Sequence, residues 1–193
     1  MTGEAPPVLL RGSSLLLREL RTEDVAAMHE IVGDRRVTDW LSFDARTLQE
    51  TGEMLESAQK RRLLTPRTEY YVGMQAPDGM LVGFIRLATD GAAAAKVGYA
   101  VRHDAWGKGY ATEALRLVLA FGFGQLELHR ITAAVGPDNR GSLAVLRHVN
   151  FVHEGRLREH VFTNGSWRDS LLYSLLRHEW PKAQNPGDDS RPR

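Results

Sequence analysis

The segment Trp106-Gly107-Lys108-Gly109-Tyr110-Ala111-Thr112-Glu113-Ala114 decides the fold of this chain. It follows an apolar run over residues 97–101 and opens a helical pattern, which predicts a strand, a glycine turn and a helix in that order. Gly107 and Gly109 lack Cβ, so the backbone can turn tightly and a ligand can approach its amides. The free N–H groups and the dipole of the first helical turn then favour an anion such as a phosphate or pyrophosphate.

Two other phosphate-binding motifs fit this segment poorly. The P-loop string G-x-x-x-x-G-K-[ST] is not found in the sequence. The dinucleotide fingerprint G-x-G-x-x-G begins at Gly107 and Gly109 but meets Thr112 where its last glycine should be. That fingerprint also belongs to the first strand of a βαβ unit, whereas here about a hundred residues precede it. An ordinary loop that enters a helix remains the alternative.

A second segment, residues 137–148, follows the apolar run at 131–135. Together the two segments resemble the GNAT superfamily of acetyl-CoA-dependent N-acetyltransferases. Its pyrophosphate loop is Q/R-x-x-G-x-G/A, which residues 106–111 match except at the first position. Its next signature is N-x-x-S, a helix and a Gly-Phe pair, and Asn139 and Ser142 match the N-x-x-S part.

The resemblance covers roughly residues 8 to 180 and departs from the family at two positions. Trp106 stands where Gln or Arg is usual, which the RimJ/RimL-type branch tolerates. Asn150 replaces the glycine of the Gly-Phe pair, and Asn also tolerates positive φ. The ending Trp167-Arg168-Asp169 with residues 171–176 is similar to the RimJ/RimL-type branch, which acetylates protein N-termini or small amines.

The composition is that of an ordinary soluble globular protein, with 193 residues, 42% hydrophobic and 25% charged. We expect a single domain over residues 1–180 and a disordered tail over residues 181–193. The net charge of +1 favours no specific nucleic-acid binding, and the lack of cysteine excludes disulfides, thiolate metal sites and cysteine nucleophiles. Residues 1–7 lack a signal-peptide pattern and no long apolar run occurs, so we expect a cytoplasmic protein with no membrane span. We expect no metal.

Hydrophobic periodicity predicts the element order β-α-α-β-β-β-α-β-α-β-β. Thr22 or Asp24 is expected to cap the first helix, and Asp44 or Thr47 the second, with Leu48, Met54, Leu55 and Ala58 facing inward. The resemblance implies the GNAT fold. That fold is a mixed α/β architecture with a twisted, mostly antiparallel sheet of six to seven strands and about four helices. The strands before the glycine loop and before Asn139 are expected to form a parallel pair that splays apart to hold the pantetheine arm. The expected strands cover residues 15–20, 70–74, 81–87, 95–101, 131–135, 154–162 and 170–176.

The resemblance also implies where acetyl-CoA binds, chiefly through backbone amides of the glycine loop. Instead of binding the cofactor, Lys108 could be a solvated surface lysine, and the Thr112 hydroxyl could cap a helix. Arg102 and His103 either contact the pantetheine or face solvent or substrate, and an amide near Ala100 or Val101 is expected to stabilise the oxyanion. The expected cofactor-binding residues are Val101, Arg102, His103, Trp106, Gly107, Lys108, Gly109, Tyr110, Ala111, Thr112, Asn139 and Ser142.

The reaction needs an acid for the leaving thiolate and a base for the amine. Ser142 matches the family's position for the acid, with an N-cap or first-turn serine of the following helix as its alternative. Glu159 and His160 are the candidate bases, with Glu69 as a third, and alternation along a strand sends Glu159 and His160 to opposite faces. An α-amino group has a pKa of about 7.7–8.0 and a lysine side chain about 10.4, so an α-amino acceptor needs less help from a base.

The sequence therefore predicts transfer of an acetyl group from acetyl-CoA to an amine, either a peptide N-terminus or a small amine. The alternatives are a non-catalytic acyl-CoA-binding or sensing module and a transferase that uses another acyl donor. The sequence leaves open whether the protein forms a homodimer. Five aromatic residues are expected either to line an acceptor site or to lie in the core and rim, namely Trp40, Phe43, Tyr70, Tyr71 and Trp106.

Overall fold

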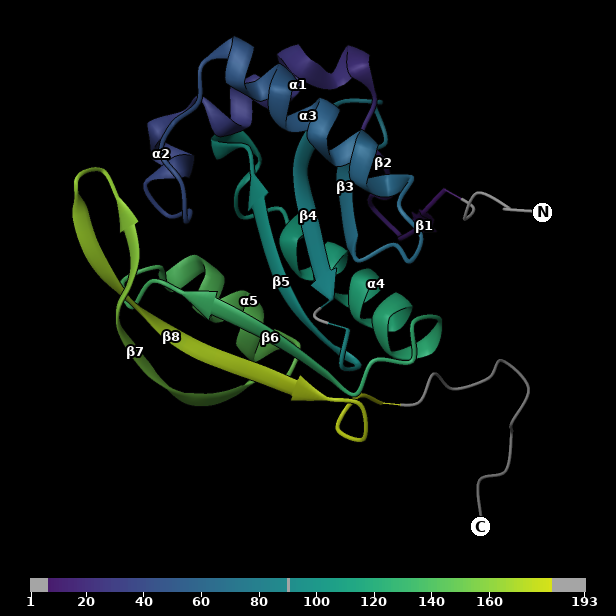
Figure 1. The fold of residues 1–193 in the computed structure, drawn as a ribbon, viewed down its shortest axis with the longest axis vertical. Coiled ribbons are helices and arrows are strands. Elements are labelled where there is room, and N and C mark those ends of the chain that lie inside the picture. The colour runs from purple at the N-terminus through teal and green to yellow at the C-terminus, as the bar shows by residue number, and fades with distance from the viewer. Residues whose placement is uncertain (1–6, 90, 182–193) are drawn as a thin grey trace.

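The computed structural model describes residues 7–89 and 91–181 (Figure 1). The strands are β1 (Leu9–Arg11), β2 (Leu16–Glu19), β3 (Glu69–Gln75), β4 (Leu81–Thr89), β5 (Ala94–Val101), β6 (Arg130–Val135), β7 (Val152–Thr163) and β8 (Ser166–Leu176). The helices are α1 (Val25–Val32), α2 (Arg35–Thr38), α3 (Leu48–Arg62), α4 (Tyr110–Gly124) and α5 (Arg140–His148), with 3-10 turns η1 (Thr22–Asp24) and η2 (His103–Ala105). The strands form one sheet in the order β1-β2-β3-β4-β5-β6-β8-β7. None of these helices is long and apolar enough to cross a membrane.

The predicted fold class is confirmed, but the described residues hold two elements that the sequence pattern does not show. The sheet has eight strands and five α-helices accompany it, because β1 and α2 add to the expected set. Strand β1 has three residues and α2 four, which is too short for a hydrophobic period to appear. The single domain over residues 1–180 stays a prediction, and the predicted tail lies outside the described residues from 182 onward.

Helix α3 begins where its capping signal predicts. Thr47 accepts a hydrogen bond from the Glu50 amide at 3.2 Å, and Glu50 accepts one from the Thr47 amide at 2.7 Å, which completes a capping box. Leu55 faces the core as expected, whereas the inward orientation expected for Leu48 is wrong because that side chain is 53% exposed. Position 48 opens the first turn of the helix, on the side away from the core.

Asp24 is the N-cap residue of α1, one of the two positions expected, but its side chain does not perform the capping expected of it. The 3-10 turn η1 precedes α1, and the Asp24 side chain makes no capping hydrogen bond to it. The Asp24 carboxylate instead accepts two hydrogen bonds from the Arg18 guanidinium, at 2.7 and 2.8 Å, and one from the Arg21 amide. Burial alone would raise the pKa of Asp24, but these hydrogen bonds outweigh it and hold the pKa below its ordinary value.

Helices cover both faces of the sheet (Figure 1). Successive side chains of β4 show the division, since Phe84 packs with α1 and α3 while Ile85 packs with α4 and α5. Both faces of the sheet are thus buried at β4, and a ligand can reach this part of the sheet only where two strands separate.

Strands β5 and β6 separate in this way. They pair in parallel only from Ala94 opposite Arg130 to Lys96 opposite Thr132. Beyond that point β6 keeps its pairing with β8 as far as Val135, and β5 keeps its pairing with β4 as far as Val101. The two strands diverge in Figure 1, which confirms the predicted splayed parallel pair.

Two predicted turns are also found. Asn164 and Gly165 have φ values of 50° and 72° and join β7 to β8, as an Asn-Gly hairpin turn requires. Asn150 has a φ of 63° at the end of α5, where the Phe151 amide donates to the Leu146 carbonyl at 3.0 Å. Asn150 therefore performs the turn for which the family uses glycine.

Candidate functional site

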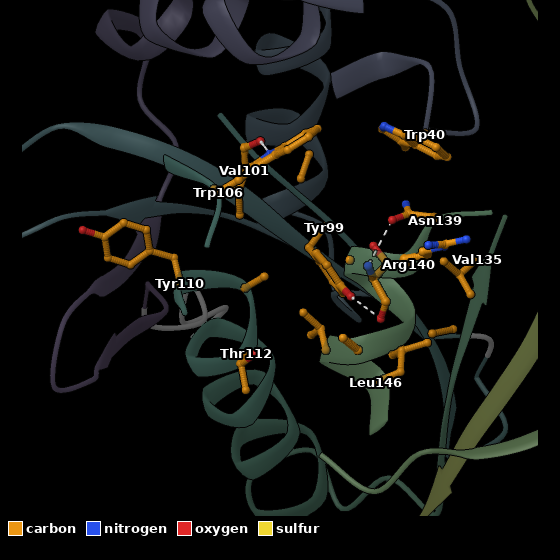
Figure 2. A pocket seen from close by; sticks show the side chains of 18 of the residues that line it. Trp40, Tyr99, Val101, Trp106, Tyr110, Thr112, Val135, Asn139, Arg140 and Leu146 are labelled. Carbon is orange, nitrogen blue, oxygen red and sulfur yellow. Dashed lines mark hydrogen bonds between the residues drawn. The ribbon is translucent and has the colours of Figure 1, made fainter. Parts of the chain in front are cut away.

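A cavity of about 670 Å³ occupies the gap between β5 and β6 (Figure 2). Its lining includes Leu146 of α5 on one face of the sheet and Val37 of α2 on the other. Between them it is lined by residues 97–101 of β5 and 133–135 of β6. The cavity therefore runs through the sheet, from the glycine loop on one face to the segment after α2 on the other.

The glycine loop has the geometry of an anion site. Gly107 and Gly109 have φ values of 76° and 82°, and Gly109 is the N-cap of α4 with no side-chain capping bond. A Cβ built on either glycine meets no atom within 4 Å, so both face open space. Thr112 is the third residue of α4 and does not cap it, so the alternative role given to its hydroxyl is wrong. The first-turn amides remain available to a negatively charged group.

Trp106 joins this loop to the end of β5. Its indole N–H donates to the Val101 carbonyl at 2.8 Å, and its ring centroid lies 4.8 Å from that of His103. Arg102 forms ion pairs with Glu30 and Asp104, both at 2.7 Å. Arg102, His103 and Lys108 lie outside the cavity lining, whereas the other predicted cofactor-binding residues belong to it.

The two residues of the N-x-x-S signature are joined by one hydrogen bond. Asn139 is the N-cap of α5, and its side-chain oxygen accepts from the Ser142 amide at 3.0 Å. Ser142 is therefore the third residue of the helix, and it lines the cavity. Asn139 fixes the start of α5, and Ser142 lies in its first turn at the cavity wall.

Tyr99 is a polar residue of the cavity that sequence reasoning passed over. Its hydroxyl donates to the Ser142 carbonyl at 3.5 Å, which joins β5 to α5 across the gap. Burial raises the pKa of the Tyr99 phenol to about 12, so the hydroxyl stays protonated at neutral pH. The signal was present in the sequence, because alternation places Tyr99 on the same face as Val97 and Val101.

Three further charged or titratable residues line the cavity, and sequence reasoning singled out none of them. Asp138 and Arg140 flank the helix cap Asn139, and His148 lies at the other end of α5, where its Nδ1 is 2.7 Å from the Ala144 carbonyl oxygen. Among the described residues of the lining, Asp138 supplies the sole carboxylate. Asp138 lies in the loop that follows β6, a strand that borders the gap, and this position was the available signal.

The candidate bases lie elsewhere. Strand β7 carries a bulge between Leu157 and Val161, and Glu159 within it has a φ of 48°. The alternation expected for Glu159 and His160 is therefore wrong at this point. Both residues are exposed and lie outside the cavity lining, with the His160 Nδ1 3.0 Å from the Ser170 hydroxyl. Their catalytic role stays a prediction.

Glu69, the third candidate base, is held in an ion-pair network on β3. Its side chain is 7% exposed and pairs with Arg61 at 2.5 Å and with Arg86. Burial alone would raise the pKa of Glu69, but the two arginines outweigh it and keep the pKa below its ordinary value. A carboxylate held in this way is a weak base.

The end of the cavity that lies after α2 is mostly apolar and aromatic. Trp40 and Leu41 line it, and Trp106 stands across the opening from Trp40 in Figure 2. The other aromatic candidates lie in the core, since Tyr71 stacks on Phe84 with ring centroids 5.1 Å apart. Tyr70 and Phe43 likewise pack against the two core clusters.

Comparisons with known proteins agree on one family. Residues 14–152 match the acetyltransferase (GNAT) domain. Probable N-acetyltransferase YjcK of Bacillus subtilis (strain 168) is 30% identical over 190 residues, which cover 94% of this chain and 99% of that protein. N-acetyltransferase p20 of Bacillus licheniformis is 28% identical, covering 86% of this chain and 94% of that protein. The solved structure of Mycobacterium smegmatis RimJ in complex with CoA-disulfide aligns with a TM-score of 0.80 at 28% identity, covering 94% of this chain and 91% of that one.

Proposed function

This chain belongs to the acetyltransferase (GNAT) domain family, and we propose that its acceptor is the α-amino group of a protein or peptide N-terminus or of a small amine metabolite. The acetyl group comes from acetyl-CoA, and the amine attacks the thioester directly while both substrates are bound. The cavity that runs through the sheet supports this proposal, because it lets the two substrates enter from opposite faces and meet between β5 and β6.

The CoA half of the cavity has the features that this donor needs. The uncapped first turn of α4 offers amides and a positive helix end to the pyrophosphate. The pantetheine arm fits the gap beside residues 97–101, where β5 has lost its pairing with β6. The relative RimJ was solved with a CoA derivative, which agrees with the same use of this fold.

In the acceptor half, Val37, Trp40 and Leu41 supply no countercharge for a cation. An acceptor amine must also lose a proton before it attacks. About a tenth or more of an α-amino group is neutral at pH 7, against less than about one part in a thousand of a lysine side chain. An apolar opening beside the reacting centre therefore favours the α-amino group.

Two groups of this chain are proposed to act on the reacting atoms. The Ser142 hydroxyl donates a hydrogen bond or a proton to the departing CoA thiolate, from the cavity wall at the start of α5. A backbone amide near Ala100 or Val101 stabilises the oxyanion, because it is fixed before the reaction begins. The carbonyl of Val101 is already bonded to Trp106, which holds this end of β5 in place.

Incubation of the protein with acetyl-CoA and an acceptor panel tests the proposal. The panel contains peptides with free N-termini, the same peptides with blocked N-termini and an internal lysine, and small amines. Release of free thiol with the unblocked peptides or small α-amines is the expected result. Thiol release only with lysine peptides would contradict the acceptor assignment. Tight acetyl-CoA binding with no turnover on any amine would instead identify a non-catalytic binding module.

A further inference from the structure

The hairpin of β7 and β8 is tied to the segment of residues 39–44, which follows α2. The Arg168 guanidinium donates to the Asp39 carbonyl through Nη1 and to the Leu41 carbonyl through Nη2, the latter at 2.5 Å. At the turn, the Asn164 amide donates to the Asp44 carboxylate at 2.7 Å. These contacts join residues 120 to 129 positions apart in the sequence. Figure 1 shows the hairpin turn beside α2.

The two carbonyls that Arg168 holds lie on either side of Trp40. Trp40 and Leu41 line the acceptor half of the cavity, so the guanidinium fixes the backbone that carries them. A guanidinium can bridge two acceptors in a fixed plane, whereas a lysine ammonium acts as a point charge. The planar guanidinium of Arg168 thus matches the geometry of the two carbonyls of this segment as well as their partial negative charge.

Arg168 contacts this segment through backbone atoms. The residue is partly buried, and its Nε is a buried atom without a hydrogen-bond partner. Both of its hydrogen bonds to the segment go to backbone carbonyls, so the guanidinium acts on the chain that carries Trp40.

We propose that Arg168 is a positioning residue that sets acceptor specificity through Trp40. Its two hydrogen bonds hold Trp40 at the cavity opening, and Trp40 then selects the group that neighbours the acceptor amine. This inference rests on the proposed function, since it assigns the α2 side of the cavity to the acceptor. It gives the Trp167-Arg168-Asp169 motif a role in the reaction that acts at a distance from the CoA loop.

The test compares Arg168→Gln and Arg168→Lys with a control on the same hairpin. Arg156→Gln is that control, because Arg156 pairs with Asp169 at 2.6 Å and does not touch residues 39–44. We expect both Arg168 variants to raise the acceptor KM about tenfold, since a small misplacement at a site is costly, while the acetyl-CoA Kd and kcat change less than about twofold. Equal changes in Arg156→Gln would overturn the proposal, as would a loss of thermal stability with no change in acceptor KM.

A double-mutant cycle tests whether Arg168 acts through Trp40. In the Trp40→Ala background, Arg168→Gln is expected to raise the acceptor KM by less than about twofold, because the residue it positions is already gone. Independent, additive effects would refute the coupling.

A readout without catalysis separates this inference from the proposed function. The Trp40 and Leu41 amides donate to the Val37 and Thr38 carbonyls at 3.2 and 2.9 Å, so hydrogen exchange reports on this segment directly. Faster exchange there in Arg168→Gln, and not in Arg156→Gln, is expected even if no acceptor is acetylated. Unchanged exchange would overturn the positioning role, whereas a lack of wild-type turnover would overturn only the proposed function.

Discussion

The Asn139 side-chain oxygen accepts a hydrogen bond from the Ser142 amide at 3.0 Å, so the two residues of the N-x-x-S signature form one structural unit. Asn139 ends the loop after β6 and caps α5, which places Ser142 in the first turn. The capping role expected as an alternative for Ser142 thus belongs to Asn139. Ser142 lies at the cavity wall, and its backbone carbonyl accepts the hydrogen bond from Tyr99.

Replacing Ser142 by Ala is expected to lower turnover about tenfold to a hundredfold, with a smaller rise in the acetyl-CoA KM. A proton-transfer aid contributes to the transition state more than to ground-state binding. Steady-state kinetics with varied acetyl-CoA measure both quantities. Ser166→Ala, at the exposed start of β8, is the control for loss of a hydroxyl. Wild-type turnover in Ser142→Ala would leave the serine a purely structural role.

Replacing Asn139 by Ala is expected to lower the free energy of unfolding by about 1 kcal/mol, because the α5 cap is lost. Asn139→Asp keeps a capping oxygen and is expected to retain most of that stability. Urea unfolding of the three proteins at pH 7 measures the difference. Equal stability of the Ala and Asp variants would mean that the cap seen between Asn139 and Ser142 contributes little.

Gly109→Val is expected to abolish acetyl-CoA binding. At a φ of 82° any L side chain is strained, and a branched Cβ would occupy the space where the pyrophosphate approaches the backbone. Gly91 has a φ of 83° and likewise no atom within 4 Å of a built Cβ, but it lies away from the cavity lining. Gly91→Val therefore reproduces the backbone strain alone. Calorimetry should show binding in Gly91→Val and none in Gly109→Val, and similar affinities in both would refute the anion site.

The Glu69 carboxylate is expected to make stability depend on pH in the acid range. Its pKa in the folded protein lies below the ordinary value of 4.5, so its stabilisation is complete above about pH 4.5 and is lost as the pH falls through the folded pKa. The difference in unfolding free energy between wild type and Glu69→Gln should then be largest near pH 7 and shrink below pH 4.5. Urea unfolding from pH 7 to pH 3 measures it, with exposed Glu53→Gln as the control. A difference that stays constant over this range would contradict the assignment.

Most of the fold could be predicted because local pattern and global fold agree. The glycine loop, the Thr47 cap and the Asn164-Gly165 turn are each specified by residues close together in the sequence. The elements that were missed, β1 and α2, are short and have no hydrophobic period of their own. Strand β1 pairs with β2 over three residues only, and the segment that follows α2 is held by Arg168 from a distant hairpin.

The parts of the site that could be predicted are those formed by the backbone of the glycine loop and of the start of α5. The residues of the loop and of the N-x-x-S signature line the cavity, apart from Lys108, because the chain itself carries them there. The region of the candidate bases could not be placed, since a bulge in β7 breaks the alternation on which their orientation was predicted. Tyr99 and Asp138 were passed over although the predicted separation of the two strands placed both beside the gap, because neither residue belongs to the quoted motifs.

The pH dependence of turnover is expected to report on the acceptor. With an α-amino acceptor the rate should rise with pH and level off near about 8, following the pKa of that group. With a lysine acceptor the rate should continue to rise above about pH 9, unless a side chain of the enzyme takes the proton. Initial rates from pH 6 to pH 10 on a verified acceptor measure the profile.

Three variants show whether a side chain takes that proton. Glu159→Gln and His160→Gln test the predicted bases, and Asp138→Asn tests the carboxylate that lines the cavity. Because Glu159 and His160 lie outside the lining, we expect Asp138→Asn to alter the profile most if a side-chain base operates. A plateau near about pH 8 in all three variants would mean that water suffices for an amine that is already partly neutral. Loss of activity in Glu159→Gln or His160→Gln alone would place that residue at the acceptor after all. A profile that rises past about pH 9 on the best acceptor would contradict the α-amino assignment itself.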